Sequence, residues 1–453
     1  MVADKIRAFE GSAKQRQYKL GELYYNTDNE EISNREFKIA YQSKSSETSF
    51  GSVQTANNPY KSNNKIASSH YKLLIDQKVN YILGKPPVYN ELVEVENIDP
   101  RITLYYAKLF DREYKKCATL ASKKGIAWGH IYIEDKKLKI KALDPDNIIP
   151  TFDENGNLTE LRKFWYKEEK DGKKKKTILY VELWTDIEVI TYRIDGKNEM
   201  EISRRYHIQD TVKFGEAEPV VESENGWGKV PFIPMFNDEQ SMYDLKPVKS
   251  LIDAWDKVYS DFANNLEDFK DIYWILKNYN GSSARSFLEQ ANSMKVIKID
   301  GDGEAAAQTF EVPHLARKTF LELANADIMK FGMGLDTDAL ASGALTNVII
   351  KARYSNLDLK ADGFVSYLEQ FVDEYQYFVN RHIDIMKLGQ PLIVEPTYTK
   401  SMIANEVEIL KANAEQMGAI SELTRLSNHV WVDNAQKEIE RIEEEQQDSV
   451  IEQ

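Results

Sequence analysis

The side chains that most often carry chemistry are few and scattered in this chain. The six histidines are His70, His130, His207, His314, His382 and His429, and no two form the His-x-x-x-His pair of a zinc-binding helix. Cys117 is the single cysteine, which excludes an intrachain disulfide and a thiolate metal cluster. The chain has no phosphate-binding loop of the Gly-x-x-x-x-Gly-Lys-Ser/Thr type and no Gly-x-Ser-x-Gly motif. We therefore predict a protein that is not an enzyme and holds no metal or cofactor, with each histidine at the surface or hydrogen-bonded in the core.

Three further polar groups are better explained as turns than as sites. Asp336 and Asp338 lack the glycine and the closing glutamate of a calcium loop. The lysine run at 173–176 follows an Asp-Gly pair between two strand patterns, which is typical of a hairpin tip. The segment LDPDNIIP at 143–150 is typical of an Asp-Pro turn between strands.

Composition narrows the class of protein. The chain has 453 residues, of which 42% are hydrophobic and 29% are charged, so it can bury a sizeable core in two to four domains. Its formal net charge of -14 argues against a protein that grips nucleic acid through clustered lysine and arginine. No stretch approaches the 18 or so apolar residues of a membrane span. The single cysteine favours a reducing compartment.

Two long runs of apolar residues, spaced three and four apart, predict the main helices. The first run is Leu245, Val248, Ile252, Trp255, Tyr259, Phe262, Leu266, Phe269, Tyr273 and Leu276. The second is Ile350, Tyr354, Leu357, Ala361, Phe364, Leu368, Phe371, Tyr375 and Phe378. Such spacing is typical of a helix with one apolar face. We predict helices at 246–277 and 348–395, the second with a kink where Gly363 interrupts it.

A glycine-rich segment, GMGLDTDALASGALTN at 332–347, separates the second of these helices from another predicted at 313–331. It holds three glycines and two aspartates but no lysine or arginine. Connections longer than about 12–15 residues without structure of their own are usually functional or disordered. Because glycine permits many backbone conformations, we interpret this segment as a loop that must change shape.

The remaining elements complete an α+β fold. Residues 1–41 are predicted as a polar helix and 42–64 as an arm rich in serine, asparagine and threonine. Helices at about 66–83 and 101–124 precede an antiparallel meander over 125–240. A small insert at 278–312 carries a short helix and strands at 294–300 and 308–312. Three helices, starting after Ser401, Ser421 and Asp433, end the chain.

The order of four blocks resembles the portal proteins of tailed double-stranded DNA bacteriophages, in particular the group from long-tailed phages of Gram-positive bacteria. The blocks are SSHYKLLIDQKVNYILGKPP, VPFIPMFNDEQSMYDLKPVKSLIDAWDKVYSDFANNLEDFKDIYWILKN, LTNVIIKARYSNLDLKADGF and ISELTRLSNHVWVDNAQKEIERIEEE. The similarity extends over roughly 60–450. Each block alone is weak, whereas their order is specific.

The resemblance implies a ring of about twelve subunits, or thirteen in isolation, around a DNA channel at one capsid vertex. Such a ring serves genome packaging, head–tail joining and genome ejection. Carried onto this sequence, the parts are an N-terminal polar arm at 1–64, a wing at 65–245, stem helices at 246–277 and 313–331, a clip at 278–312, a tunnel loop at 332–347, a kinked wing helix at 348–395 and a crown at 396–453.

The resemblance also implies which residues meet DNA and which partners assemble with the ring. The channel-loop residues are Gly332, Gly334, Leu335, Asp336, Asp338, Leu340, Gly343, Leu345 and Asn347, and Lys318 and Lys330 are candidates for the channel face of the stem. The expected partners are a terminase packaging motor, a head–tail adaptor, major capsid and scaffolding proteins, and double-stranded DNA that passes through without sequence recognition. The expected location is the virion, after assembly in the host cytoplasm, with no membrane involved.

Two other functions compete with this interpretation. A coiled-coil adaptor or scaffold without a channel would have the same apolar runs, and only subunit stoichiometry separates it from a ring. A nuclease or other phosphoryl-transfer enzyme would show metal-dependent turnover of DNA.

Overall fold

The computed structural model describes most of the chain, and the structural statements below concern these residues. They are 2–36, 38–42, 53–57, 62–91, 99–171, 174–208, 226–268, 273–277, 304–308, 313–337, 346–402, 411, 414–427, 432, 438–439 and 441–443. None of the helices among them is long and apolar enough to span a membrane.

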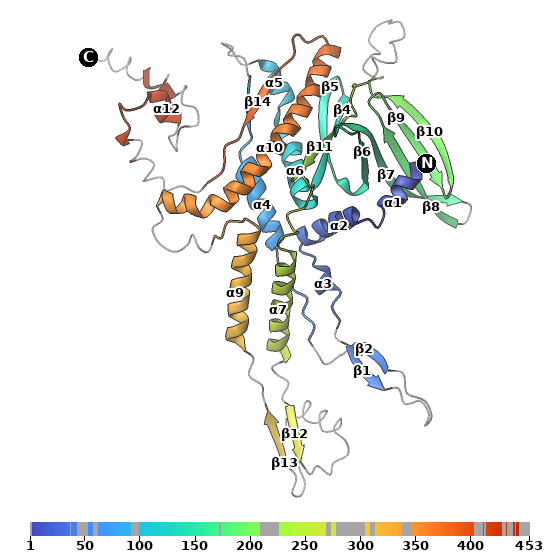
Figure 1. Cartoon of the computed structure of the whole chain (residues 1–453), viewed down its shortest axis with the longest axis vertical. Helices are drawn as coiled ribbons and strands as arrows, with labels where there is room; N and C mark the ends of the chain where they lie inside the picture. The colour runs from blue at the N-terminus through green and yellow to red at the C-terminus, as the bar shows by residue number, and fades with distance from the viewer. Residues whose placement is uncertain are drawn as a thin grey trace. The chain divides into compact units, whose positions relative to one another are not determined.

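The chain folds into two compact units, each built from separate stretches of sequence. The larger unit comprises Met1–Tyr25, Tyr71–Pro247 and Met329–Gln453, and the smaller comprises Asn26–His70 and Val248–Ile328. Both contain helices and antiparallel strands (Figure 1), which confirms the α+β prediction.

The larger unit contains two antiparallel sheets beside α6 (Lys108–Lys124) and α10 (Asn347–Ile385), as Figure 1 shows. The five-stranded sheet has the order β10-β9-β8-β7-β6 and the three-stranded sheet has the order β11-β4-β5. Their strands are β4 (Ile126–Glu134), β5 (Lys137–Leu143), β6 (Ile148–Phe152), β7 (Leu158–Asp171), β8 (Lys174–Trp184), β9 (Glu188–Asp195), β10 (Asn198–Tyr206) and β11 (Phe232–Phe236). The predicted meander is thus antiparallel as expected but divided between two sheets. A further pair, β3 (Val88–Glu91) with β14 (Val394–Thr397), joins distant parts of the chain.

The N-terminal residues pack against these sheets. Helix α1 (Val2–Phe9) places Ala3 and Ile6 in a core cluster with strand residues of the five-stranded sheet. Helix α2 (Ala13–Tyr25) contributes Tyr18 to the cluster that fills the space between the two sheets. The prediction of one polar helix over 1–41 is therefore wrong for this part, which forms two helices with buried residues. The apolar residues Ile6 and Tyr18 are few, but both point into the core, and Gly11 with φ +76° separates the two helices.

Helices α6 and α10 build the rest of the larger unit's core. Helix α6 (Lys108–Lys124) ends at Gly125, which adopts the left-handed conformation. Helix α10 (Asn347–Ile385) buries every residue of the second predicted apolar run, so that prediction is confirmed. Phe110 of α6 stacks on Tyr375 of α10 with ring centroids 4.4 Å apart. Figure 1 shows that α10 changes direction along its length.

The second helix ends earlier than its predicted limit at residue 395. Lys387 and Gly389 have φ of +54° and +112°, and the Leu388 amide donates back to the Ile383 carbonyl at 2.9 Å. This left-handed exit, followed by Pro391, is typical of a helix C-terminus. The smaller helices of this unit are α4 (His70–Leu83), α5 (Pro100–Tyr105) and α12 (Glu422–Ser427). Helix α4 begins with one residue of the smaller unit, and α12 confirms the helix predicted after Ser421.

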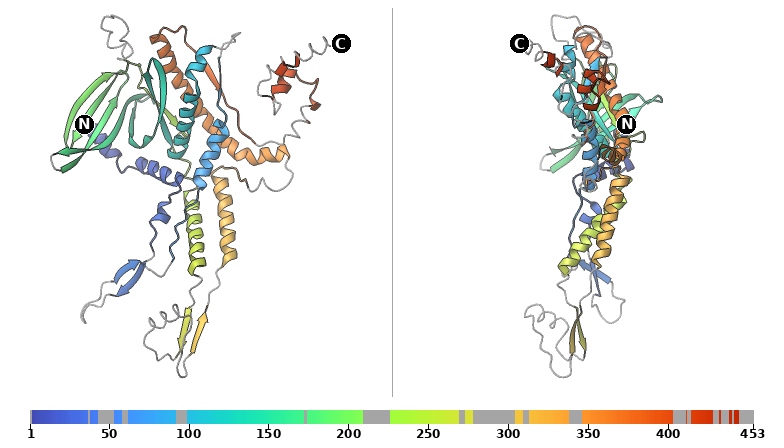
Figure 2. Two further views of the ribbon diagram at one scale, coloured as in Figure 1. Left: turned by 180° about the vertical axis from the view of Figure 1, so that it is seen from behind. Right: turned by 90° about the vertical axis from the view of Figure 1, so that its left-hand side faces the viewer.

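The smaller unit holds two helices that lie side by side (Figures 1 and 2). Helix α7 is Lys249–Asp268, and α9 is His314–Phe331, whose last turn belongs to the larger unit. The His70 ring contacts both, because it packs edge-on against Trp255 at 4.9 Å and lies 2.9 Å from the Asn325 side-chain oxygen. The short helix α3 (Glu30–Ser33) and the strand pair β1 (Lys38–Gln42) and β2 (Val53–Asn57) also belong to this unit.

The first apolar run does not stay helical to its end. Residues 273–277 form strand β12 (Tyr273–Lys277), which pairs antiparallel with β13 (Glu304–Gln308). The prediction of a helix over 246–277 is wrong there. Tyr-Trp-Ile is a strong strand-forming sequence, and its spacing from the preceding apolar residues matched the helical pattern by chance. The predicted strand at 294–300 and most of the tail helices after Ser401 and Asp433 lie outside the described residues.

An extended segment, 62–69, runs along a polar face of α7. Asp256, Ser260 and Asn264, here named the polar ladder, are buried and spaced four residues apart. They accept hydrogen bonds from the backbone amides of Ser68, Ile66 and Asn64, at 2.9, 3.0 and 2.6 Å. Four helical residues advance about 6 Å and two extended residues about 6.6 Å, so helix and segment stay in register. Residues 62–69 therefore cover the polar side of α7.

Ile6→Ala tests the packing of the N-terminal helix. Ile6 is fully buried, so the free energy of unfolding should fall by about 2–4 kcal/mol. Arg7→Ala, at an exposed neighbour on the same helix, is the control and should change it by less than about 0.5 kcal/mol. Urea denaturation followed by tryptophan fluorescence measures both. If both variants changed the free energy of unfolding by the same negligible amount, helix α1 would not be packed into the core.

Candidate functional site

The candidate site is the glycine-rich segment that follows α9. Residues 332–337 and 346–347 are described, whereas Asp338, Leu340, Gly343 and Leu345 lie outside the described residues. Residues 332–336, here named the loop root, belong to the larger unit. At the far side of the loop, Thr346 is the N-cap of α10, and its side chain accepts from the Ile349 amide at 3.5 Å.

The loop root begins with a regular helix exit. Met333 has φ +54°, and the Gly334 amide donates to the Met329 carbonyl at 2.8 Å. The Met333 amide donates to the Lys330 carbonyl at 3.2 Å. This left-handed residue with a bond back to the last turn ends α9 cleanly. The chain therefore leaves the helix in a defined direction.

Two other helices hold the loop root by hydrogen bonds. From α4, the Gln77 side-chain amide pairs with both backbone groups of Leu335, donating to its carbonyl at 2.8 Å and accepting from its amide at 3.0 Å. From α10, the Lys360 ammonium donates to the Gly332 carbonyl at 2.8 Å. Leu335 itself is 7% exposed. These contacts make the loop root an ordered part of the larger unit.

Gly334 is a close-approach position. A Cβ added there would lie 2.4 Å from Leu74 Cδ2 and 3.0 Å from Gln77 Oε1. The sequence suggested that the glycines of this segment supply freedom of motion. For Gly334 the structure gives a different reason, because only glycine lets the backbone reach α4.

A buried charge cluster is linked to the loop root through Lys360. Asp244 is 8% exposed and its Oδ2 lies 3.3 Å from Lys78 Nζ and 3.2 Å from Lys360 Nζ. Asn237 donates to Asp244 Oδ1 at 2.9 Å and accepts from Lys78 at 2.6 Å. Lys78 also lies 3.9 Å from the centre of the Phe364 ring. One carboxylate thus joins α4, the segment before α7 and α10.

The cluster alters the pKa values of its members. Burial alone would raise the pKa of Asp244, but the charges of Lys360 and Lys78 and the Asn237 hydrogen bond lower it to about 2. Burial lowers the pKa of Lys78 to about 8, in spite of Asp244. Asp244 is therefore ionised throughout the physiological range.

The two lysines proposed for the stem lie on different sides of α9. Lys318 forms a 3.7 Å pair with Glu322 in which both side chains are largely exposed. Lys330 is exposed and lies 5.7 Å from the Phe331 ring centre. Twelve residues separate them, which places them about 120° apart around the helix axis. One face of α9 therefore cannot point both lysines equally toward a channel.

Large apolar side chains are exposed on the three long helices. They are Tyr259 and Leu266 on α7, Leu315, Phe320, Leu323 and Phe331 on α9, and Val348, Ile349 and Leu359 on α10. Leu323 and Val348 are 63% and 74% exposed. On α7 the polar ladder is buried together with Ile252, whereas Tyr259 and Leu266 are exposed.

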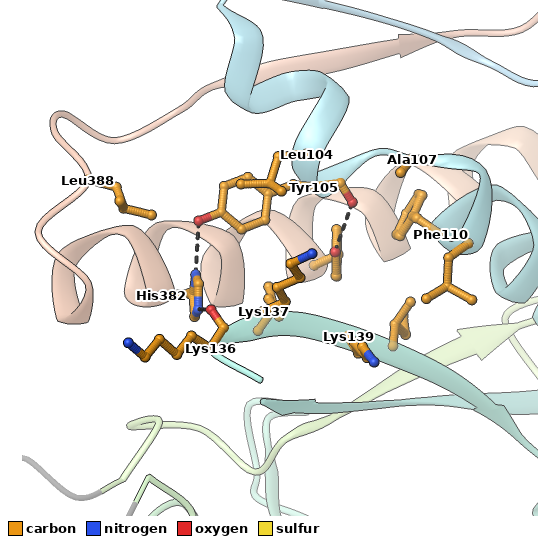
Figure 3. Close-up of a pocket in the computed structure, with 13 residues that line it drawn as sticks. Leu104, Tyr105, Ala107, Phe110, Lys136, Lys137, Lys139, His382 and Leu388 are labelled. Carbon is orange, nitrogen blue, oxygen red and sulfur yellow. Dashed lines mark hydrogen bonds between the residues drawn. The ribbon is translucent and has the colours of Figure 1, made fainter. Parts of the chain in front are cut away.

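A separate small pocket lies between α5, β5 and α10 (Figure 3). Its volume is about 150 Å³, and its lining includes His382. His382 Nε2 lies 3.2 Å from the Lys136 carbonyl, which only accepts, so Nε2 carries the proton and Nδ1 accepts from the Tyr105 hydroxyl at 2.9 Å. Burial lowers the pKa of His382. His382 is thus a hydrogen-bonded core residue, as predicted.

Comparison with known proteins identifies the family. The family described as "Phage portal protein, SPP1 Gp6-like" matches residues 10–452. The chain belongs to this family. The portal protein of Clostridium phage phiCD119 is 28% identical over 397 residues, covering 83% of each chain. The portal protein of Bacillus phage SPP1 is 27% identical over 406 residues, covering 85% of this chain and 76% of its own.

A solved structure shows a weaker similarity. It is the neck of an empty GTA particle computed with C6 symmetry, with a TM-score of 0.43 and 11% identity over 79% of this chain and 87% of its own.

The family confirms the main interpretation of the sequence. The chain is a portal protein of the kind found in phages of Gram-positive bacteria, with a structural role in the virion. In the part of the chain that the structure describes, no three histidine, cysteine, aspartate or glutamate side chains gather as metal ligands.

Sequence reasoning found the loop but missed its anchors. Gln77 and Lys360 are 258 and 28 residues from their loop partners. Nothing in the spacing of polar residues on a helix marks which of them will bond to a distant backbone. Leu74 lies in the helix predicted at about 66–83, but its contact with Gly334 depends on tertiary packing.

Asp244→Asn tests the charge cluster. Removing the charge leaves buried Lys78 and partly buried Lys360 without a carboxylate partner, so the free energy of unfolding should fall by about 3 kcal/mol at pH 7. Because the folded pKa of Asp244 is depressed, its contribution is present above pH 3.8 and is lost as pH falls towards 2. The difference between wild type and variant should therefore narrow between pH 4 and 2 in urea denaturation. Glu168→Gln, in an exposed pair with Lys175, is the control and should cost less than about 1 kcal/mol. If the difference in unfolding free energy between wild type and variant stayed constant down to pH 2, the lowered pKa of Asp244 would be contradicted.

Gly334→Ala tests the close approach. Forcing a methyl against Leu74 should lower the free energy of unfolding by about 1–3 kcal/mol. The matched control is Gly363→Ala on α10, where an added Cβ meets nothing within 4 Å and should stabilise the helix by up to about 1 kcal/mol. Thermal unfolding of both variants measures these changes. If Gly334→Ala left the stability unchanged, the role of this glycine would be flexibility and not close approach.

Proposed function

We propose that about twelve copies of this chain form a ring around a channel through which double-stranded DNA enters and leaves the capsid. In this ring α7 and α9 are the stem, the β12–β13 hairpin is part of the clip, and the sheets with α10 are the wing. Residues 332–347 are the tunnel loop that faces DNA. The crown is residues 396–453. The protein acts without catalysis of its own.

The observation that carries the proposal is the outward-facing apolar surface of the long helices, in a chain of the portal family. The polar ladder of α7 is buried under residues 62–69, while Leu266 of the same helix is 61% exposed. On α9, Leu315 and Leu323 are 69% and 63% exposed. Exposed apolar surface of this kind is typical of an interface, and a ring supplies a neighbour for every copy.

The charge of the chain suits transport better than tight binding. Each copy carries -14, so the ring as a whole repels DNA at long range. The loop contains no lysine or arginine, and its contacts with DNA would be apolar or through the backbone. Such contacts are weak and permit sliding. We further propose a packaging motor, a head–tail adaptor and capsid and scaffolding proteins as partners, and assembly in the host cytoplasm.

The test is the mass of the purified particle, measured by native mass spectrometry with electron micrographs of the same sample. A ring with a central hole and a mass near twelve or thirteen times 52.3 kDa is expected. Leu323→Glu should reduce the mass to that of the single chain, because it places a charge in the interface. Lys318→Gln makes the same change in net charge about 140° away on α9 and should leave the ring intact. A wild-type dimer under all salt conditions would favour the coiled-coil adaptor instead.

A further inference from the structure

We propose that the pocket between α5, β5 and α10 is a docking site for an acidic segment of another protein. The segment places one large apolar side chain in the pocket and carboxylates beside it. The proposal concerns a surface of one subunit, so it goes beyond the ring and its channel and does not depend on them. It is supported by the apolar pocket itself, by the lysines that line it and by one open stretch of the edge of β5.

The pocket has the size and the apolar lining that suit a single side chain. Its volume is about 150 Å³, and an engineered apolar cavity of about that size takes up benzene. The leucines Leu104, Leu109 and Leu388 line it and are 52%, 39% and 43% exposed. They come from α5, α6 and the exit of α10. A large apolar side chain that entered the pocket would therefore bury apolar surface of both partners.

The charged side chains that line the pocket are all positive. They are Lys136, Lys137 and Lys139, on the β5 side of the pocket (Figure 3), in a chain with 73 acidic and 59 basic residues. Lys139 pairs with Glu134 across the turn between β4 and β5. Lys136 and Lys137 are both exposed. A carboxylate brought to this side of the pocket therefore meets a local excess of lysine, which favours an acidic partner.

The outer edge of β5 offers backbone groups to the same segment, because β5 is the last strand of its sheet. The Ala142 amide points outward, since it donates to the Glu113 carboxylate at 2.9 Å. The Lys136 carbonyl also points outward, since it accepts from His382 at 3.2 Å. Alternate residues of an antiparallel strand point the same way, so the amide and carbonyl of Leu138 point outward as well. Among the residues that the structure describes, none bonds to these two groups of Leu138.

These features define the sequence of the segment. A residue placed opposite Leu138 exchanges two backbone hydrogen bonds with it. Pairing extends no further along the strand, because Ile140 is only 2% exposed. Leu138 shares a face of β5 with the buried Ile140, whereas Lys137 and Lys139 lie on the other face. The residue opposite Leu138 should therefore be apolar, and its two neighbours, which point to the lysine face, should be acidic.

A second copy of this chain is a poorer occupant. Its strand β10 comes nearest to the required sequence, with Met200 and Ile202 48% and 45% exposed beside Glu199 and Glu201. Both glutamates already have partners within the chain. Glu199 accepts the first two amides of α1 at 3.2 and 3.0 Å, and Glu201 pairs with Arg204 at 3.0 Å. A separate protein is therefore the occupant that fits the pocket.

Binding of a synthetic peptide to the purified full-length protein tests the proposal. The probe is a fluorescent peptide of about eight residues with one phenylalanine between glutamates. It should bind saturably, and moving all its glutamates to one end, at unchanged composition, should weaken binding at least about ten-fold. Hydrogen exchange at the Leu138 amide should slow at least about ten-fold in the complex. No saturable binding up to about 1 mM peptide, or equal binding of the rearranged peptide, would overturn the proposal.

Reversing the charge of the two exposed lysines tests the complementarity. Lys136→Glu combined with Lys137→Glu should weaken binding of the probe at least about ten-fold and should bind a probe that carries lysine in place of glutamate. The matched control is Lys167→Glu combined with Lys170→Glu, which makes the same change in net charge at exposed positions of β7. Binding of the probe to this control should be unchanged. If the control weakened binding equally, net charge alone would attract the peptide, and the pocket would not be its site.

Leu138→Pro tests the strand edge. Proline removes the outward amide, while the neighbouring residues keep their pairing with β4, so binding of the probe should weaken at least about ten-fold. Leu138→Val keeps the amide and should bind the probe normally. If Leu138→Pro folds poorly, methylation of the phenylalanine amide of the probe removes a bond to the same edge from the other side. Normal binding of the methylated probe would contradict the pairing with Leu138.

Other occupants would give different results. A loss of particle mass in the Lys136→Glu, Lys137→Glu variant, measured by native mass spectrometry, would show that the pocket is a contact between copies of this chain. Displacement of the probe by double-stranded DNA would show that the lysines bind phosphate. Either result would overturn the proposal. Failure of the proposed ring is distinguishable, because it appears as the absence of a ring from the wild-type protein and leaves binding of the peptide unchanged.

Discussion

The buried carboxylate of Asp244 is the interaction on which the arrangement of the larger unit depends. A charge that is removed from water is tolerated only when opposite charges and hydrogen bonds replace the solvent. Asp244 meets this requirement with Lys78 of α4, Lys360 of α10 and the Asn237 amide. Because the three partners come from separate parts of the chain, satisfying one carboxylate fixes the relative positions of α4, α10 and the strand exit at residue 237. The loop root then rests on the same two helices.

The smaller unit uses polar contacts in a different way. The polar ladder of α7 accepts the backbone amides of residues 62–69, so an extended segment that forms no sheet still has hydrogen-bond partners. The consequence is that α7 turns its polar side inward and leaves Tyr259 and Leu266 exposed. The arrangement fits the proposed ring, in which neighbouring copies would cover these apolar surfaces.

Sequence patterns predicted the structure correctly where apolar residues recur at helical spacing over many turns. Every member of the second apolar run is buried in α10, because nine positions with helical spacing leave no other explanation. The first run had the same appearance, yet Tyr273–Lys277 is a strand, since pairing with Glu304–Gln308 outweighs a spacing that strand-forming residues matched by chance. The prediction for the N-terminal residues was wrong for the opposite reason. Two apolar side chains, Ile6 and Tyr18, are too few to make a pattern but enough to join a core.

The sequence by itself determined the class of protein, the α+β composition, the long helices and the position of the glycine-rich loop, because composition, periodicity and the order of sequence blocks are all local or linear properties. Only the tertiary structure decided what holds that loop. Gln77 meets Leu335 across 258 residues, and Gly334 is glycine because Leu74 lies against it. Such contacts follow from how the helices pack, and a hydrogen bond between one side chain and one distant backbone group leaves no periodic trace in the sequence.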